Sequence, residues 1–275
     1  MRIAVLGCGP TGLIAAHACA VNSVDFEIFS KRRKSFLFGS QYLHEPIPGI
    51  VSEEEKVPVH YVNVGTPEEY RRKAHGKFWD GIVAPEDFET EHNAWNIREA
   101  YDRLWVKYGR QVQDYEFVNA HRTMCDLRLD NYDLVISSVP RTIWKIDGEE
   151  YVYSLGWAIG DAPEHGLFVP FDLPDNTIIC DGSSENAYNR LSRVFGYTTV
   201  EWPHHTEREV ILESLQGSAN SISQITKPLR YQPNPCVPNP THEWLHVGRY
   251  GEWRKGVVVT DAWSEVCKTL DKMNQ

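Results

Sequence analysis

The sequence lacks paired cysteines, an excess of basic charge and a long apolar run. Its six cysteines stand singly, with no C-x-x-C pair, which predicts reduced thiols in a cytoplasmic setting and no disulfide framework. The formal net charge is −10, and tight binding to duplex nucleic acid needs clustered Lys and Arg. No apolar stretch approaches the roughly 20 residues that span a bilayer. We therefore expect neither tight binding to duplex nucleic acid nor a membrane anchor.

Several common catalytic patterns are missing as well. No Ser-His-Asp order and no P-loop lysine signature occurs, which argues against a hydrolase or a kinase. The neighbouring pair His204 and His205 has no carboxylate–histidine spacing around it. Adjacent residues rarely point at one ion, so we interpret this pair as structural and predict no metal site.

A glycine-rich turn stands near the N-terminus. Residues 2–6 are typical of a buried parallel strand, residues 11–20 of a small-residue helix and residues 26–29 of a second strand. Between the first strand and the helix, the run from Gly7 to Gly12 reads G-x-G-x-x-G. The first glycine permits a tight turn, the second lets the backbone approach a pyrophosphate, and the third lets helix and strand pack closely. The helix N-terminus also attracts phosphate. The pattern predicts a dinucleotide site on an α/β, Rossmann-type domain with a parallel sheet flanked by helices.

The acidic residue that usually follows this motif by about 20 residues is absent. The second strand ends instead in Ser30, Lys31 and Arg32. Two interpretations remain open. Either Ser30 and backbone groups hold the ribose diol, or the basic side chains receive a 2′-phosphate, which would favour NADP.

The C-terminal region contains GRYGEW at residues 248–253, followed by apolar residues and a helix that includes Asp261. With this stretch the chain resembles the FAD-dependent amine-oxidase-like superfamily, and within it the UDP-galactopyranose mutases. Local matches occur at residues 7–12, 96–105, 188–193 and 248–253, and the strand at 134–139 resembles the one that returns to the FAD domain. The missing acidic ribose ligand and the short chain depart from the mutases.

The resemblance implies FAD as the cofactor. NADP stays open as an alternative or a reductant, because of the basic residues after the second strand. It places Gly248 and Arg249 at the FAD phosphates or ribityl chain, and Val257 and Val258 near the flavin ring. The expected cofactor contacts are Gly7, Gly9, Pro10, Thr11, Gly12, Ser30, Lys31, Arg32, Gly39, Ser40, Gln41, Val139, Gly248, Arg249, Trp253, Gly256, Val257 and Val258.

Candidate catalytic residues flank the expected flavin position. Tyr42 and His44 follow the loop at 39–41, and His44 is either an acid–base group or a hydrogen-bond partner of the flavin. Arg190 matches a position where mutases carry an arginine for substrate phosphates, a role that suits a guanidinium group. The expected substrate contacts are Trp95, Asn96, Arg190 and Arg193. Plain core packing for Trp95 and surface ion pairing for the arginines are the alternatives.

We expect a two-domain flavoprotein with a discontinuous FAD domain. That domain would comprise residues 1–65, 121–185 and 227–275, and a smaller α+β substrate domain would comprise residues 66–120 and 186–226. The oligomeric state is open.

The expected function is that of a FAD-dependent oxidoreductase acting on a C–N or C–H bond of a small molecule or of a modified nucleotide or amino acid. One alternative is a mutase-like enzyme that uses reduced flavin on a nucleotide sugar without net redox change. The other is an NADP-binding reductase or a non-catalytic nucleotide-binding protein.

Overall fold

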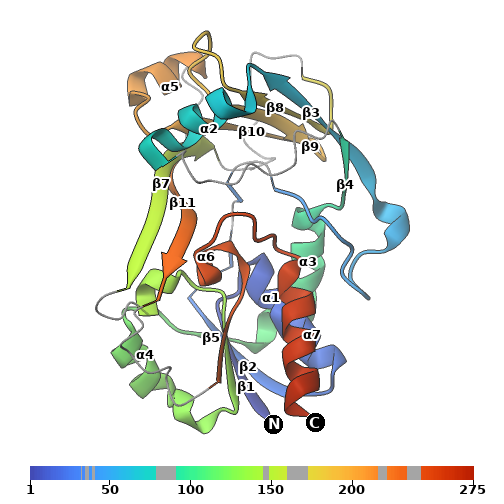
Figure 1. Cartoon of the computed structure of the whole chain (residues 1–275). Coiled ribbons are helices and arrows are strands. Elements are labelled where there is room, and N and C mark those ends of the chain that lie inside the picture. The colour runs from blue at the N-terminus through green and yellow to red at the C-terminus, as the bar shows by residue number, and fades with distance from the viewer. Residues whose placement is uncertain are drawn as a thin grey trace.

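The computed structural model describes residues 1–31, 33–34, 37–38, 41–78, 91–144, 149–159, 173–215, 222–233 and 243–275. These residues form two units, each built around one sheet, and Figure 1 shows the units stacked with both chain termini at the far end of one of them. Among the described residues, none of the helices has the length and apolarity needed to cross a bilayer.

The first unit contains a five-stranded sheet in the order β12-β6-β1-β2-β5. Every neighbouring pair in it is parallel. Its strands are β1 (Arg2–Leu6), β2 (Asp25–Ser30), β5 (Val112–Asp114), β6 (Leu134–Ser137) and β12 (Glu243–His246). Strand β1 is buried on both faces, because Ile3 and Val5 enter one core cluster while Ala4 and Leu6 enter another. Such continuous apolar runs are typical of parallel sheets covered on both sides.

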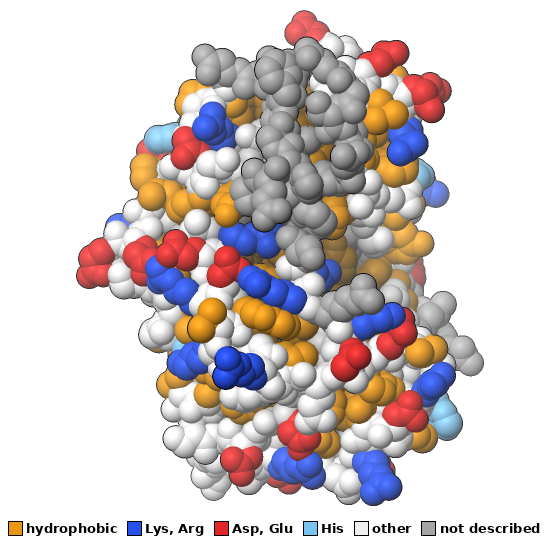
Figure 2. Space-filling model, turned by 180° about the vertical axis from the view of Figure 1, so that it is seen from behind, with side chains coloured by type: hydrophobic (Ala, Val, Ile, Leu, Met, Phe, Trp, Pro, Cys, Tyr) orange, Lys and Arg blue, Asp and Glu red, His pale blue; other side chains and the backbone are white. Residues whose placement is uncertain are grey.

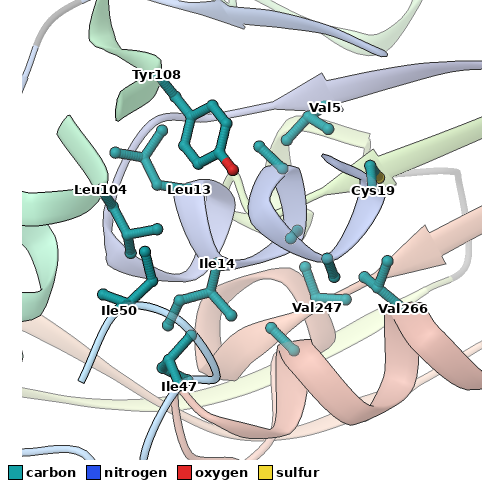
Figure 3. Close-up of a cluster of buried hydrophobic side chains, with 14 of the residues drawn as sticks. Val5, Leu13, Ile14, Cys19, Ile47, Ile50, Leu104, Tyr108, Val247 and Val266 are labelled. Carbon is teal, nitrogen blue, oxygen red and sulfur yellow. The ribbon is translucent and has the colours of Figure 1, made fainter. Parts of the chain in front are cut away.

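Three helices cover one face of this sheet and one covers the other. On the first face lie α1 (Pro10–Val21), α3 (Ile97–Tyr108) and α7 (Asp261–Met273). Figure 3 shows Leu13 of α1, Leu104 of α3 and Val266 of α7 converging on a single cluster. Helix α4 (Ala120–Leu127) packs on the opposite face. This unit is therefore a three-layer α/β structure with parallel strands, and the predicted fold class is confirmed.

The second unit contains a seven-stranded sheet in the order β11-β7-β10-β9-β8-β3-β4. Its strands are β3 (Val57–Val64), β4 (Glu91–Ala94), β7 (Glu150–Ile159), β8 (Thr177–Asp181), β9 (Arg190–Val194), β10 (Tyr197–Pro203) and β11 (Ile222–Gln232). The pairs are antiparallel except β3 with β8. Helix α2 (Pro67–His75) packs on one face and α5 (Arg208–Ser214) on the other. Figure 1 shows the short helix α6 (Gly248–Glu252) between the two units.

Short 3-10 turns complete the described elements. They span Glu53–Glu55, Gly76–Phe78, Gly109–Gln111, Leu129–Asn131 and Arg141–Trp144.

The predicted elements of the N-terminal βαβ unit and the last helix are confirmed as β1, α1, β2 and α7. The division of the chain between the units differs from the expected boundaries. Strand β3 pairs with β8 and so belongs to the second sheet, whereas α3 buries its apolar face against α1 in the first unit. Pro228 lies inside β11. The strand tolerates it because β11 is an edge strand whose register shifts between Pro228 and Arg230.

Candidate functional site

The turn between β1 and α1 is closed on one side and open on the other. Gly7 has a φ of 101°, and its N–H donates to the carbonyl of Phe29 at 2.9 Å. A Cβ at Gly12 would overlap the carbonyl oxygen of Gly7 and lie 2.8 Å from Ser138 Oγ. A Cβ at Gly9 would meet no atom within 4 Å. The second glycine of the motif thus faces open space, as a backbone that lets a phosphate approach requires.

Helix α1 begins beside that open side. Gly9 is its N-cap, Pro10 is its first residue, and no side chain caps the helix. The first N–H groups of a helix have no intrahelical partners, and together with the helix dipole they favour an anion. The residues present therefore fit the diphosphate of a dinucleotide.

The glycine turn lies at the carboxyl ends of the parallel strands. Tyr101 donates its hydroxyl hydrogen to the Cys8 carbonyl at 2.9 Å, and Ser138 Oγ donates to the Leu6 carbonyl at 3.0 Å. Val139 is buried next to Gly7. In open α/β sheets, ligands bind at the strand ends where the strand order reverses, and here that point lies between β1 and β6.

The end of β2 holds the expected ribose-binding residues. Ser30 lies beside the Cys8 thiol. Lys31 is exposed and forms an ion pair with Glu116, so it already has an anionic partner. Arg32 lies outside the described residues.

The C-terminal stretch contacts the start of α1. Gly248 has a φ of 73°, and a Cβ there would lie 2.6 Å from Thr11 Cγ2, so the start of α6 abuts the start of α1. Val257 is buried, and the N–H of Val258 donates to Asp261 Oδ2 at 2.8 Å, which fixes the loop at the start of α7. Residues that lie far apart in the sequence thereby meet beside the glycine turn.

Other expected cofactor contacts lie elsewhere or are only partly described. Trp253 is buried, and its ring makes edge contacts with Tyr151 and Tyr153 of β7, 5.6 and 6.0 Å between centroids. Gln41 is exposed and donates to the Phe38 carbonyl at 2.7 Å. Gly256 has a φ of 87° and faces open space. Gly39 and Ser40 lie outside the described residues.

Tyr42 and His44 are neighbours in space, with ring centroids 4.6 Å apart. Tyr42 is buried, and its hydroxyl lies 2.8 Å from the hydroxyl of Tyr61. The protein packed around the His44 side chain lowers the pKa of its imidazole by desolvation. His92 adds to this shift, and Asp261 opposes it. His44 is therefore neutral at pH 7, with one ring nitrogen able to donate and the other able to accept a hydrogen bond.

Trp95 and Asn96 have structural partners. Trp95 is 4% exposed within the core of the first unit, and its indole N–H donates to the Ser52 carbonyl at 2.9 Å. Asn96 is the N-cap of α3, where its Oδ1 accepts hydrogen bonds from the N–H groups of Arg98 and Glu99 at 3.0 and 3.2 Å. These contacts account for both side chains without a ligand.

Arg190 and Arg193 lie on opposite faces of β9, because side chains alternate along a strand. Arg190 Nη1 is 3.7 Å from Glu201 Oε1, and its guanidinium lies 5.8 Å from the ring centroid of Tyr70. Arg193 is exposed. The structure does not bring the two arginines to one ligand.

Further charged residues, which no sequence motif indicated, lie near Arg190. They are His75, Glu201, Lys227 and Lys255, from α2, β10, β11 and the segment after α6. No local motif links them, since they are spread over 181 residues. Alternation along β10 gave no signal for Glu201, because a charged residue between the apolar Val200 and Trp202 is typical of the solvent-facing side of a strand.

Three solved structures are similar to this chain over nearly its whole length. One is a peptidyl tryptophan dihydroxylase essential for tryptophylquinone cofactor biogenesis, with a TM-score of 0.53, 11% identity and coverage of 99% of this chain and 66% of that one. Another is 2,6-dihydroxypyridine-3-hydroxylase from Arthrobacter nicotinovorans, with a TM-score of 0.53, 11% identity and coverage of 98% and 83%. A flavoprotein/dehydrogenase from Cytophaga hutchinsonii has a TM-score of 0.50, 12% identity and coverage of 98% and 76%.

The chain shares the fold of these proteins. At 11–12% identity the likeness concerns the fold alone. The chain spans about two thirds of the length of the dihydroxylase. No protein-family model and no curated protein matches the sequence. One of the three structures is described as a flavoprotein, and none is described as a mutase or an amine oxidase.

Proposed function

We propose that the chain is a FAD-dependent oxidoreductase that acts on a C–H or C–N bond of a small molecule. The observation that carries the proposal is the glycine turn, with Gly7 and Gly12 packed tightly and Gly9 facing open space at an uncapped helix start. The fold supports it, since the similar structures include two hydroxylases and a flavoprotein. When bound, FAD supplies the redox chemistry, and the protein supplies orientation and electrostatics.

The residues of the chain have distinct tasks in this proposal. Gly9 and the first N–H groups of α1 hold the diphosphate. The loop from Gly256 to Thr260 precedes α7 and is fixed by the hydrogen bond from Val258 to Asp261. The dipole at the start of α7 would stabilise negative charge on the flavin ring. His44, with its lowered pKa, and the hydroxyl of Tyr42 offer hydrogen-bonding groups to the flavin or the substrate.

An absorbance spectrum of the purified protein, with the cofactor released by heat and identified by chromatography, tests the proposal. Flavin bands and FAD in the supernatant are the expected result. A colourless protein that neither carries nor takes up FAD but binds NADPH would refute it and would make the Lys31 loop the primary site.

The same preparation tests the mutase alternative. A redox enzyme consumes oxygen or another acceptor in proportion to product, whereas a mutase converts a nucleotide sugar only after dithionite reduction and without net oxidation. Turnover of UDP-galactopyranose by the reduced protein alone would replace the oxidoreductase proposal.

A further inference from the structure

Charged side chains from three strands share one face of the seven-stranded sheet. The register places Arg190 of β9 opposite Glu201 of β10, and Glu201 opposite Ala158 of β7. Lys227 of β11 lies opposite Ser154, which is on the same face of β7 as Ala158. Arg190, Glu201 and Lys227 therefore point to the same side, which is also the side of α2, because His75 of α2 hydrogen-bonds Ser154.

Positive charge exceeds negative charge in this group. Lys227 Nζ lies 2.8 Å from Glu201 Oε2, and Arg190 Nη1 lies 3.7 Å from Glu201 Oε1, so one carboxylate serves two cations. Glu201 and Lys227 are each 7% exposed. Burial favours the neutral form of Glu201, but Lys227 and Arg190 outweigh it and lower its pKa to about 2, so the carboxylate is charged at pH 7.

Arg249 of α6, the helix between the two units, adds a further cation. Burial lowers the pKa of the Arg249 guanidinium; Tyr250 and Glu201 oppose this shift, and Arg190 adds to it. Among the described residues, Arg249 Nε and Arg190 Nε are buried and have no hydrogen-bond partner. Guanidinium N–H groups in such a position cost free energy unless a ligand accepts from them.

Lys255 and His75 complete the group. Lys255 Nζ lies 3.3 Å from His75 Nε2, and His75 Nδ1 lies 2.9 Å from Ser154 Oγ. Burial lowers the pKa of His75 to about 2, with Lys255 and Lys227 adding to the shift, so the imidazole is neutral. Burial also lowers the pKa of Lys255 to about 7, followed by the repulsion of Arg249. Among the described residues, Glu201 is the acidic side chain that forms ion pairs with cations of this group.

The sheet makes room for this arrangement at Gly156. A Cβ at Gly156 would lie 3.1 Å from Lys227 Cε and 3.0 Å from the Trp202 carbonyl oxygen, so the lysine side chain passes directly over the glycine. Figure 2 shows Lys and Arg side chains gathered around a hollow at mid-height on one face of the molecule.

We propose that Arg190, Lys227, Arg249 and Lys255 form a binding site for a small molecule that carries two negative charges, as a phosphate monoester or a dicarboxylate does. Buried cations are costly unless they are paired, and one carboxylate leaves at least two positive charges for a ligand. Guanidinium groups match oxyanions through paired N–H donors. The inference rests on the proposed function in one respect, since it assigns this dianion to the substrate of the flavoprotein.

The test uses the holoprotein at low ionic strength and pH 7, titrated separately with inorganic phosphate and with succinate in a calorimeter. Sodium chloride at equal ionic strength is the reference. Saturable binding of either anion is expected, with phosphate and succinate distinguishing the two kinds of ligand. Arg249→Gln and Lys255→Met should each weaken that binding at least tenfold. Neither residue forms an ion pair among the described residues, so both variants are expected to fold.

Arg254→Gln is the matched control, because Arg254 is exposed, pairs with Glu252 and follows Arg249 by five residues. It should leave anion affinity unchanged. Absence of binding by both anions, or equal affinity in the two site variants and the wild type, overturns the inference. Loss of FAD from Arg249→Gln with the anion affinity intact also overturns it, because the cluster would then belong to the cofactor. A protein without FAD whose phosphate binding still responds to both variants would refute the proposed function and leave the anion site standing.

Discussion

Substituting alanine at two glycines of the same turn should separate cofactor binding from folding. At Gly12, the new Cβ would overlap the Gly7 carbonyl oxygen and lie 2.8 Å from Ser138 Oγ, closer than real Cβ atoms approach. The neighbours are partly backbone, so the turn itself has to shift. Overpacking of this kind costs about 3 kcal/mol. For a chain of this size we expect Gly12→Ala to lower the Tm of the FAD-free protein by about 6–12 °C.

At Gly9, the same methyl group enters open space. Gly9 has a φ of −68° and a ψ of 177°, which alanine adopts without strain, so Gly9→Ala should change the Tm of the FAD-free protein by about 2 °C or less. The methyl group would nevertheless stand where the diphosphate approaches. A loss of about 1.4 kcal/mol or more is expected, which weakens FAD binding at least about tenfold, and a bulkier side chain should abolish retention.

The assay is reconstitution of the FAD-free proteins, with FAD affinity followed by flavin fluorescence and stability by thermal unfolding. Comparing FAD-free forms matters because a bound cofactor stabilises the folded state by mass action. Unchanged FAD affinity in Gly9→Ala would show that the open side of the turn does not face the diphosphate, and the assignment of the cofactor site would fail.

Three further outcomes follow from particular contacts. Lys255→Met should raise the Tm more at pH 6 than at pH 9. Burial lowers the pKa of Lys255 to about 7, so below pH 7 the folded protein bears a desolvated ammonium group, and this cost fades as the pH rises from 7 toward the pKa of the unfolded chain. An equal effect on the Tm at both pH values would contradict this. Asn96→Ala removes the N-cap of α3 and should lower the free energy of unfolding by about 1 kcal/mol, which corresponds to a fall of roughly 2–4 °C in Tm. A loss of phosphate affinity in calorimetry would instead reveal a ligand contact. Asp261→Ala removes the acceptor for the Val258 N–H and should lower the free energy of unfolding by about 1 kcal/mol in urea titrations, with no loss expected if that loop is held by other contacts.

The sequence by itself determined the N-terminal strand, glycine turn and helix of the first unit. The strand of residues 2–6, the glycine turn and the following helix are contiguous, so local spacing specifies both the fold of the segment and its open side at Gly9. The last helix was equally predictable from the sequence, because Ala262, Val266 and Leu270, which are buried in the structure, recur at helical spacing.

Only the tertiary structure decided the remaining assignments. Strand register brought Arg190, Glu201 and Lys227 to one face and turned Arg193 to the other, and the packing of α2 and α6 added His75 and Arg249. Trp95 and Asn96, which suggested a substrate pocket, proved to have partners in the core and at a helix start. The physical reason is that a charged site assembled across a sheet depends on which strands pair and in which register, and those non-local pairings leave no short-range periodicity in the sequence.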